Sequence, residues 1–469
     1  MSLKHQVINS LSWNTIAVLV NTLMQVLRIA VLARLLDASA FGLVAISLAI
    51  VAFCEVFSDL GFTVPLLHKQ DITKHQYSSV FWVNVFISIV IYLILFLVSP
   101  LIANAYSSDE LIQICRLLGL TVIVNALGKI FQTRRTKDLQ FKFISIVSII
   151  SSVLGFLIIF VLAYKGFGVY SLVYGTISQI VFRQGVYFFT GLRTETISFY
   201  INLSEIKDFF KIGGYQLGSQ LCDFVVAKAD VFILGKMVGM TELGYYNLAK
   251  ELVLKCYTLL NSITRGVMTS ALAKVQTDNI RTSKIFSIFS EILSYSGVLL
   301  FLFLFAFSSF VSKAMYGESY IYIEPLLRIL CFYGLFSTFI SPMAALSMAK
   351  GRTDIVLSWT VSTAVISLGI TAASASWGLY SLVYAQVAIS IIFFFLNWKM
   401  IIARLLGMSL QKYVSIYLFA VIGMVIPSLI LNIIDIKQFV LLCVVYTCTV
   451  GMILFIIYKK RYVSFIRKQ

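Results

Sequence analysis

Two stretches of the chain decide its architecture: GVYSLVY at residues 168–174 and GLYSLVY at residues 378–384. They agree at six of seven positions, and each follows an aromatic residue, Phe167 or Trp377. A second pair, VLARLLDASAFGLV at 31–44 and ILGKMVGMTELGYY at 233–246, aligns at an offset of 202 residues, against 210 for the first pair. Repeats keep their period apart from loop insertions, so these matches predict an internal duplication.

The composition indicates the solvent in which this chain folds. Of its 469 residues, 60% are apolar and 12% are charged, against roughly half apolar and a quarter charged in soluble domains. Apolar runs of about 20 residues, the length that crosses a bilayer as a helix, recur from end to end. The predicted fold class is an all-α integral membrane protein with about 14 transmembrane helices, near residues 10–35, 42–67, 79–103, 111–133, 143–164, 169–190, 206–238, 243–270, 284–311, 323–348, 355–376, 378–403, 413–432 and 438–458.

The duplication groups these helices into two copies of six. We predict an N-terminal lobe at 1–200, a C-terminal lobe at 201–407, and two extra helices with a basic tail at 408–469. Because six is even, both copies enter the membrane in the same direction, and a pseudo-two-fold axis should run along the membrane normal. A cleft between two such lobes is a frequent site for a transported substrate.

The basic residues predict the orientation. Loops on one side of the predicted membrane hold 23 of the 37 Lys and Arg residues. By the positive-inside rule, this side and both termini are cytoplasmic. The net charge of +17 is therefore a topology signal, and no soluble basic module is present that would bind nucleic acid. The opposite side holds only Arg34, Lys165, Lys236, Lys313 and Lys437.

Polar residues inside the apolar runs are the candidates for function. A charge near the bilayer centre costs about 2.5–3.5 kcal/mol on insertion scales, so it usually faces a bundle interior or a watery cavity. In the first helix, polar residues recur at steps of seven, four and three, which places them on one face. These residues are Asn14, Asn21, Gln25 and Arg28, and at the offset of 202 three of them align with Gln216, Asp223 and Asp230 of the seventh helix.

Similar stripes in the second and eighth predicted helices complete the expected walls of the cleft. Asn21, Gln25, Arg28, Arg183, Lys255 and Arg265 are the candidate substrate-binding residues. Glu55, Asp59, Asp223, Asp230 and Glu251 are the candidates for ion coupling or charge balance. The alternative is that such charges form ion pairs inside one lobe or extend to the membrane interface, and it applies especially to Arg116, Lys129, Lys228 and Arg328.

Sequence signatures of soluble enzymes are missing. The chain has no Walker A sequence, no G-x-S-x-G and no H-E-x-x-H. Its three histidines, His5, His68 and His75, lie near predicted cytoplasmic ends, and its seven cysteines lie in apolar spans without C-x-x-C spacing. We therefore expect neither a metal nor a cofactor, and we interpret the chain as a transporter rather than an enzyme.

Four segments of the first half resemble a known family. They are LARLLDASAFGLVAIS at 32–47, FSDLGFTVPLLHK at 57–69, SSVFWVNV at 78–85 and GFGVYSLVYG at 166–175. Together they resemble the polysaccharide-export branch of the multidrug/oligosaccharidyl-lipid/polysaccharide exporter superfamily. The likeness is greatest to Wzx-type flippases and to colanic-acid or teichuronic-acid exporters, and it covers nearly the whole chain.

The resemblance implies a multi-pass protein of the bacterial inner membrane. Such proteins move an undecaprenyl-pyrophosphate-linked oligosaccharide to the outer leaflet by alternating access, and coupling to H⁺ or Na⁺ is expected. The implied partners are the lipid-linked oligosaccharide, membrane lipids, and the polysaccharide polymerase and chain-length machinery. Arg28, Arg265 and Arg183 would then contact the pyrophosphate or acidic sugars, because Arg binds phosphate through two parallel hydrogen bonds.

Three alternatives stay open from the sequence. A drug or cation antiporter of the same superfamily predicts an acid-dominated cleft, whereas basic residues here at least match the acids. A lipid II flippase shares the fourteen-helix layout and differs in substrate. From another class, a membrane polysaccharide polymerase or ligase would lengthen or transfer glycan without moving it across the bilayer.

Overall fold

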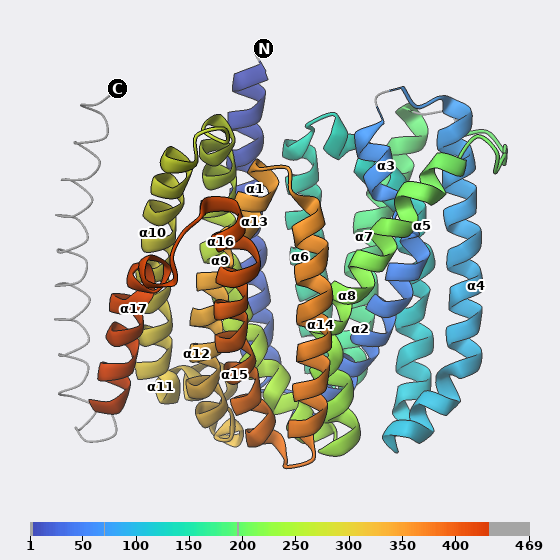
Figure 1. Cartoon of the computed structure of the whole chain (residues 1–469). Helices are drawn as coiled ribbons and strands as arrows, with labels where there is room; N and C mark the ends of the chain where they lie inside the picture. The colour runs from blue at the N-terminus through green and yellow to red at the C-terminus, as the bar shows by residue number, and fades with distance from the viewer. Residues whose placement is uncertain (1–2, 70, 195–196, 431–469) are drawn as a thin grey trace.

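A computed structural model describes residues 3–69, 71–194 and 197–430 (Figure 1). Over these residues the chain is helical and has no strand. Most of the long helices run side by side between two ends of the molecule, with the N-terminus at the upper end in Figure 1. The helices are α1 (Leu3–Leu32), α2 (Ala38–Asp59), α3 (Thr63–His68), α4 (Lys74–Tyr106), α5 (Glu110–Lys137), α6 (Phe141–Tyr164), α7 (Val169–Thr194), α8 (Lys207–Met237), α9 (Met240–Lys274), α10 (Asn279–Ala306), α11 (Ser308–Tyr316), α12 (Ile323–Ile340), α13 (Pro342–Ala349), α14 (Thr353–Ala375), α15 (Leu379–Asn397), α16 (Ala403–Leu406) and α17 (Leu410–Ile430).

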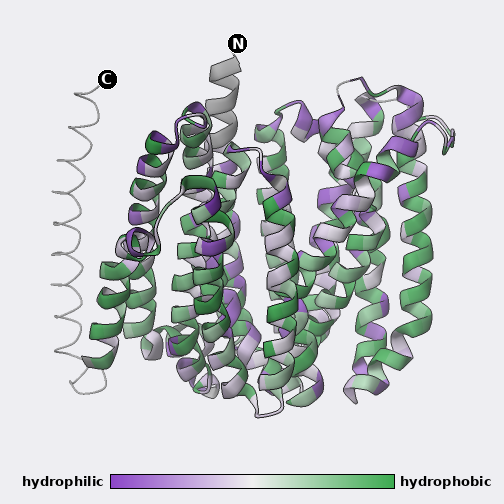
Figure 2. Ribbon diagram, in the orientation of Figure 1, coloured by the Kyte–Doolittle hydropathy of each residue, from purple (hydrophilic) through white to green (hydrophobic). Residues whose placement is uncertain are grey.

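Ten helical segments of the described residues are long and apolar enough to cross a membrane. The prediction of an all-α, multi-pass membrane protein is thus confirmed. Figure 2 shows the outer helix α4 as mostly hydrophobic along its length, and its Leu97 and Leu101 are exposed side chains that suit contact with lipid. The helix predicted at 438–458 lies outside the described residues, so the total of fourteen stays a prediction.

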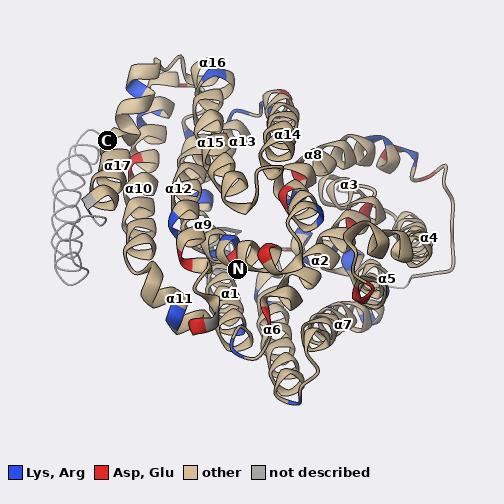
Figure 3. Cartoon of the chain, turned by 90° about the horizontal axis from the view of Figure 1, so that it is seen from below, with Lys and Arg blue, Asp and Glu red and all other residues tan. Residues whose placement is uncertain are grey.

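Three long helices, α7, α8 and α9, are not among those ten. Each is long enough to span a bilayer, but polar and charged residues interrupt its apolar sequence. In Figure 3, which looks along the helices, charged residues of α8 and α9 lie toward the middle of the bundle. Their charged residues therefore need protein or water, rather than lipid, around them.

Several predicted single spans are broken in the structure. The span at 42–67 is divided into α2 and α3, because Leu60 and Gly61 have φ angles of 45° and 69°, in the left-handed region that ends a helix. The span at 323–348 is likewise divided, with Pro342 at the first position of α13, where its missing N–H costs no helical hydrogen bond. By contrast, α9 runs unbroken for 35 residues in the second copy.

The two halves of the chain, α1–α7 and α8–α16, meet most closely through α2 and α9. A Cβ on Gly42 would lie 2.0 Å from the Met240 carbonyl oxygen, and a Cβ on Gly244 would lie 1.8 Å from that of Ala38. Gly42 aligns with Gly244, and Ala38 with Met240, at the offset of 202. The contact is thus reciprocal, as a two-fold relation between duplicated halves requires, although the segment boundaries at 200 and 407 stay predictions.

A second contact joins the halves at the opposite, upper end. There α3 packs against the start of α8, and a Cβ on Gly213 would lie 2.3 Å from the Leu60 carbonyl oxygen. The Lys69 ammonium lies 2.9 Å from the Asp208 carboxylate across the same contact. This ion pair is exposed, so we assign the packing of the two backbones, not the charge, the larger part in holding α3 to α8.

The duplication also extends to Arg116 and Arg328, for which an ion pair inside one lobe and extension to the membrane interface were alternatives. Arg116 donates from Nε to Ser99 Oγ at 2.9 Å, and its guanidinium lies 4.0 Å from the centre of the Phe96 ring. Arg328 repeats the arrangement with Ser308 at 2.8 Å and with the Phe305 ring. Both arginines therefore bind a neighbouring helix, and each half has its own copy of this anchor.

Candidate functional site

A cavity of about 230 Å³ lies between α1, α2 and α7 of the first half and α9 of the second. It is nearer the lower end in Figure 1, because Phe41, Leu172 and Asn247 fall within two turns of the starts of α2, α7 and α9. Its volume is below the roughly 300–1,000 Å³ usual for ligand pockets. In this conformation it has room for part of a large head group, not for an oligosaccharide.

One side of the cavity is charged. Arg28 from α1 faces Glu251 and Lys255, which lie one turn apart on α9. The Lys255 ammonium is 3.8 Å from the Glu251 carboxylate, and Glu251 also attracts the Arg28 guanidinium. We call these three residues the charged wall. Because it has two cations for one anion, the cavity as a whole favours a negatively charged ligand.

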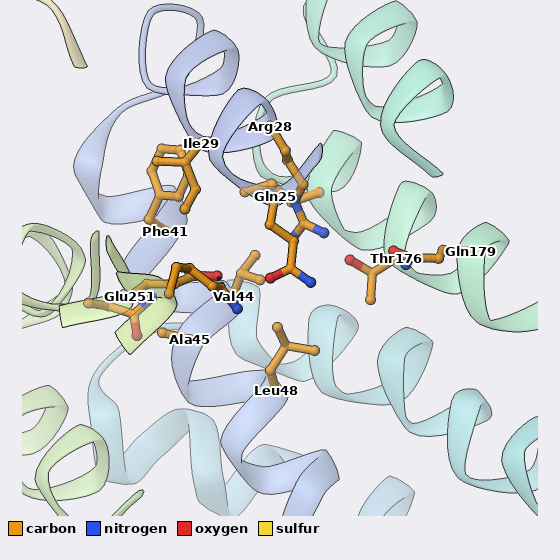
Figure 4. Close-up of a pocket in the computed structure, with 13 residues that line it drawn as sticks. Gln25, Arg28, Ile29, Phe41, Val44, Ala45, Leu48, Thr176, Gln179 and Glu251 are labelled. Carbon is orange, nitrogen blue, oxygen red and sulfur yellow. Dashed lines mark ion pairs between the residues drawn. The ribbon is translucent and has the colours of Figure 1, made fainter. Parts of the chain in front are cut away.

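The other side is polar without charge. Gln25 from α1 and Thr176 and Gln179 from α7 line it, and we call these three residues the neutral wall. Figure 4 shows Gln25 and Arg28 extending into the cavity between Glu251 on one side and Thr176 with Gln179 on the other. Apolar side chains from α1, α2 and α7 complete the lining: Ile29, Phe41, Val44, Ala45, Leu48 and Leu172.

A chain of hydrogen bonds fixes the neutral wall from behind. Gln179 donates to Ser152 at 3.3 Å, and Ser152 donates to the Asn21 carbonyl at 2.7 Å. The Asn21 amide in turn donates to Ser148 at 2.8 Å. Asn21 was predicted to bind substrate, but the structure places it behind the cavity, where it joins α1 to α6 and orients Gln179 through Ser152.

A second polar cluster lies in the first half beyond the cavity. Glu55 of α2 accepts a hydrogen bond from Asn125 of α5 at 2.5 Å, and Gln184 of α7 donates to the Asn125 carbonyl at 2.9 Å. Arg183 and Lys129 are close enough to attract Glu55. We call Glu55, Asn125 and Gln184 the Glu55 cluster. Arg183 thus belongs beside this cluster and does not line the cavity.

Asp230 is held inside the second half. Its carboxylate accepts short hydrogen bonds from Lys250 and Tyr246, and all three residues are buried. The structure therefore gives Asp230 a charge-balancing position between α8 and α9, away from the cavity lining.

The remaining candidates also lie apart from the cavity. Asp59 accepts a hydrogen bond from Thr63 at 2.8 Å, where α2 gives way to α3. Asp223 and Arg265 are exposed side chains on α8 and α9. Of the eleven predicted residues, the structure brings together Gln25, Arg28, Glu251 and Lys255.

Sequence reasoning overlooked Thr176 and Gln179. A signal for them was present, since Thr176, Gln179 and Arg183 recur at steps of three and four residues and so share one face of α7. This face extends from the cavity to the Glu55 cluster. Within the described residues no three His, Cys, Asp or Glu side chains come together as a metal site.

Residues 31–325, more than half of the chain, match the polysaccharide biosynthesis protein family. The chain belongs to this family. The sequence-based assignment to the polysaccharide-export branch is thereby confirmed.

Curated relatives resemble the chain over most of its length. It is 26% identical to the teichuronic acid biosynthesis protein TuaB of Bacillus subtilis over 416 residues, which cover 88% of this chain and 85% of that protein. It is also 26% identical to the lipopolysaccharide biosynthesis protein WzxC of Escherichia coli, over 88% of this chain and 84% of that protein.

Solved structures show the fold. The lipid II flippase MurJ in an inward closed conformation superposes with a TM-score of 0.76 at 13% identity, covering 95% of this chain and 99% of MurJ. An inward-facing multidrug transporter of the MATE family superposes with a TM-score of 0.63 at 16% identity, covering 83% of this chain and 96% of that one. The chain therefore has the fold of these membrane transporters.

Proposed function

We propose that this protein is a flippase that moves an undecaprenyl-pyrophosphate-linked oligosaccharide across the bacterial inner membrane. The observation that supports this most is the cavity shared by α1, α2, α7 and α9, with its excess of cations. Arg28 and Lys255 would hold the pyrophosphate, since charge-assisted hydrogen bonds to phosphate are about twice as strong as neutral ones. Membership of a polysaccharide biosynthesis family supports a glycan as the cargo.

The contacts between the halves support alternating access. The lower end is closed by the reciprocal packing of Gly42 and Gly244, and the cavity lies only about two turns above it. The predicted orientation makes this the non-cytoplasmic end. The contact of α3 with α8 joins the halves at the other end, so each of the two contacts would have to open in turn. The head group would enter from the cytoplasm, and a rocking motion of the halves would open the glycine contact.

Coupling to H⁺ or Na⁺ is part of the proposal. The Glu55 cluster is the better position for it, because it lies farther along the face of α7 that begins at the cavity with Thr176 and Gln179. Asp230 is less suited, since Lys250 already neutralises it. The drug antiporter alternative is disfavoured by the excess of positive charge in the cavity, whereas a lipid II flippase differs only in cargo.

The test removes two positive charges from the cavity and leaves polar side chains in their place. In a strain that lacks this chain, Arg28→Gln together with Lys255→Gln should lower surface glycan about tenfold or more at equal protein level, because each phosphate contact contributes about 1.5–3 kcal/mol. Arg352→Gln, which removes an exposed ion pair with Asp354 at 2.7 Å, is the matched control and should export normally. Wild-type export by the double variant would contradict the proposal.

Reconstitution of the purified protein in liposomes distinguishes a flippase from a polymerase or ligase. Purified protein should move the lipid-linked oligosaccharide between leaflets and leave the glycan unchanged in length. Lengthened or transferred glycan would instead identify an enzyme.

A further inference from the structure

Thr176 has unused hydrogen-bonding capacity in the cavity wall. Its side chain is 8% exposed, and its hydroxyl has no hydrogen-bond partner in the described protein. A helical Thr usually donates to the carbonyl four residues earlier, as Thr190 on the same helix does to Val186. Figure 4 shows the Thr176 side chain directed into the cavity. Because this unpartnered hydroxyl faces a cavity, it is free to bind an atom of a ligand or a water there.

The neighbours of Thr176 offer further donors and acceptors of the same neutral kind. Gln25 and Gln179 line the cavity beside it, and each amide has both an acceptor oxygen and two donor hydrogens. Gln179 is fixed by its hydrogen bond to Ser152 and by Gly155 of α6, where a Cβ would approach the Gln179 side chain within 2.8 Å. Gln179 is thus held in position before any ligand arrives.

The chemistry of this wall differs from that of the charged wall on α9. Carbohydrate hydroxyls both donate and accept hydrogen bonds, so they match hydroxyl and amide side chains, and they bring no charge that would need a counter-ion. The neutral wall has no carboxylate for a metal cation and no cation for a phosphate. An apolar ligand would leave the Thr176 hydroxyl unsatisfied.

We propose that the cavity is divided, and that Gln25, Thr176 and Gln179 form a sugar subsite beside the phosphate subsite of Arg28 and Lys255. This inference rests on the proposed function and names the part of the cargo that each wall recognises. Since the cavity measures about 230 Å³, the subsite takes the sugar ring that adjoins the pyrophosphate, while the rest of the glycan lies outside it. Asn21 is a positioning residue that acts through Ser152 and Gln179.

The experiment compares two ligands that differ only in the glycan. One is the lipid-linked oligosaccharide extracted from a strain that lacks this chain, and the other is undecaprenyl pyrophosphate. Binding of each to the purified full chain is measured for wild type and Thr176→Val, which removes the hydroxyl at nearly constant volume. The affinity of Thr176→Val for the glycan-bearing lipid should fall about five- to tenfold, and its affinity for undecaprenyl pyrophosphate should stay within twofold of wild type.

Two further variants separate recognition from folding. Thr176→Ser keeps the hydroxyl and should restore glycan-dependent binding, whereas Thr190→Val should leave both affinities unchanged, because that hydroxyl bonds its own helix. Equal losses for both lipids in Thr176→Val, or no loss for either, would overturn the sugar subsite. A wild-type protein that binds both lipids equally would also overturn it while leaving the proposed function intact. Failure of wild type to bind either lipid would refute the proposed function itself.

Discussion

The two halves of the molecule use equivalent positions for opposite purposes. Arg28 of α1 and Asp230 of α8 align at the offset of 202. Arg28 lines the shared cavity, whereas Asp230 is buried against Lys250 and Tyr246. After the duplication, one copy of this position stayed open to a ligand and the other was closed by partners from its own half. The comparison teaches that a duplicated stripe predicts a duplicated fold but not a duplicated site.

A second pair of positions shows the same division. Gln184 on α7 belongs to the Glu55 cluster, and at the offset of 210 it aligns with Phe394 on α15. Phe394 packs on the rings of Phe339 and Tyr413, with centroids 6.1 and 4.8 Å apart, in an aromatic cluster that extends onto α17. The first half therefore keeps its polar interior next to the cavity, while the second half is filled with rings that hold the extra helix.

The largest expected effect is a difference in stability between variants at the aligned positions Arg28 and Asp230. Asp230→Ala should lower the free energy of unfolding by about 3–5 kcal/mol, because it leaves the Lys250 ammonium buried without a partner. Arg28→Ala at the equivalent position should change it by less than about 1 kcal/mol while reducing export. Thermal unfolding in detergent, with export measured in parallel, checks both.

The double variant Asp230→Ala with Lys250→Met is the control for that experiment. It removes both charges and should recover much of the lost stability. Equal destabilisation by Arg28→Ala and Asp230→Ala would show that the two positions do not differ in role.

A smaller effect tests the reciprocity of the contact between α2 and α9. Gly42→Ala and Gly244→Ala should each destabilise the protein by about 1–3 kcal/mol, since each new Cβ meets a backbone carbonyl of the other half. Gly214→Ala is the matched control, because a Cβ there has no neighbour within 4 Å. In thermal unfolding, Gly42→Ala and Gly244→Ala should lower the stability by similar amounts, and Gly214→Ala should not lower it. A large effect of one and none of the other would contradict the two-fold relation.

The sequence predicted the helices well because the length of an apolar run can be read directly from the order of the residues. It predicted the duplication because the two motif pairs have nearly the same offset. It also predicted, from the polar stripes, a cleft walled by α1, α2, α8 and α9, whereas the cavity is lined by α1, α2, α9 and, in place of α8, α7. These features depend on spacing alone.

The sequence could not decide which stripe residues are bound by neighbours. Asp230 is hydrogen-bonded to Lys250 because α8 packs against α9. Asn21 is hydrogen-bonded to Ser148 and Ser152 because α1 packs against α6. Thr176 and Gln179 were overlooked because α7 was not among the helices expected to line the cleft, although their spacing with Arg183 places all three on one face of that helix. The break after Asp59 depends on the left-handed φ angles of Leu60 and Gly61, and the break before Pro342 on a missing N–H, neither of which hydropathy reports.

The most direct test of the central claim is a structure of the full chain with the lipid-linked oligosaccharide bound, determined by electron cryo-microscopy in nanodiscs. The account predicts the pyrophosphate within hydrogen-bonding distance of Arg28 and Lys255, with the adjoining sugar against Thr176 and Gln179. Pyrophosphate bound instead beside Arg183 and Lys129, or at the exposed Arg265, would contradict it.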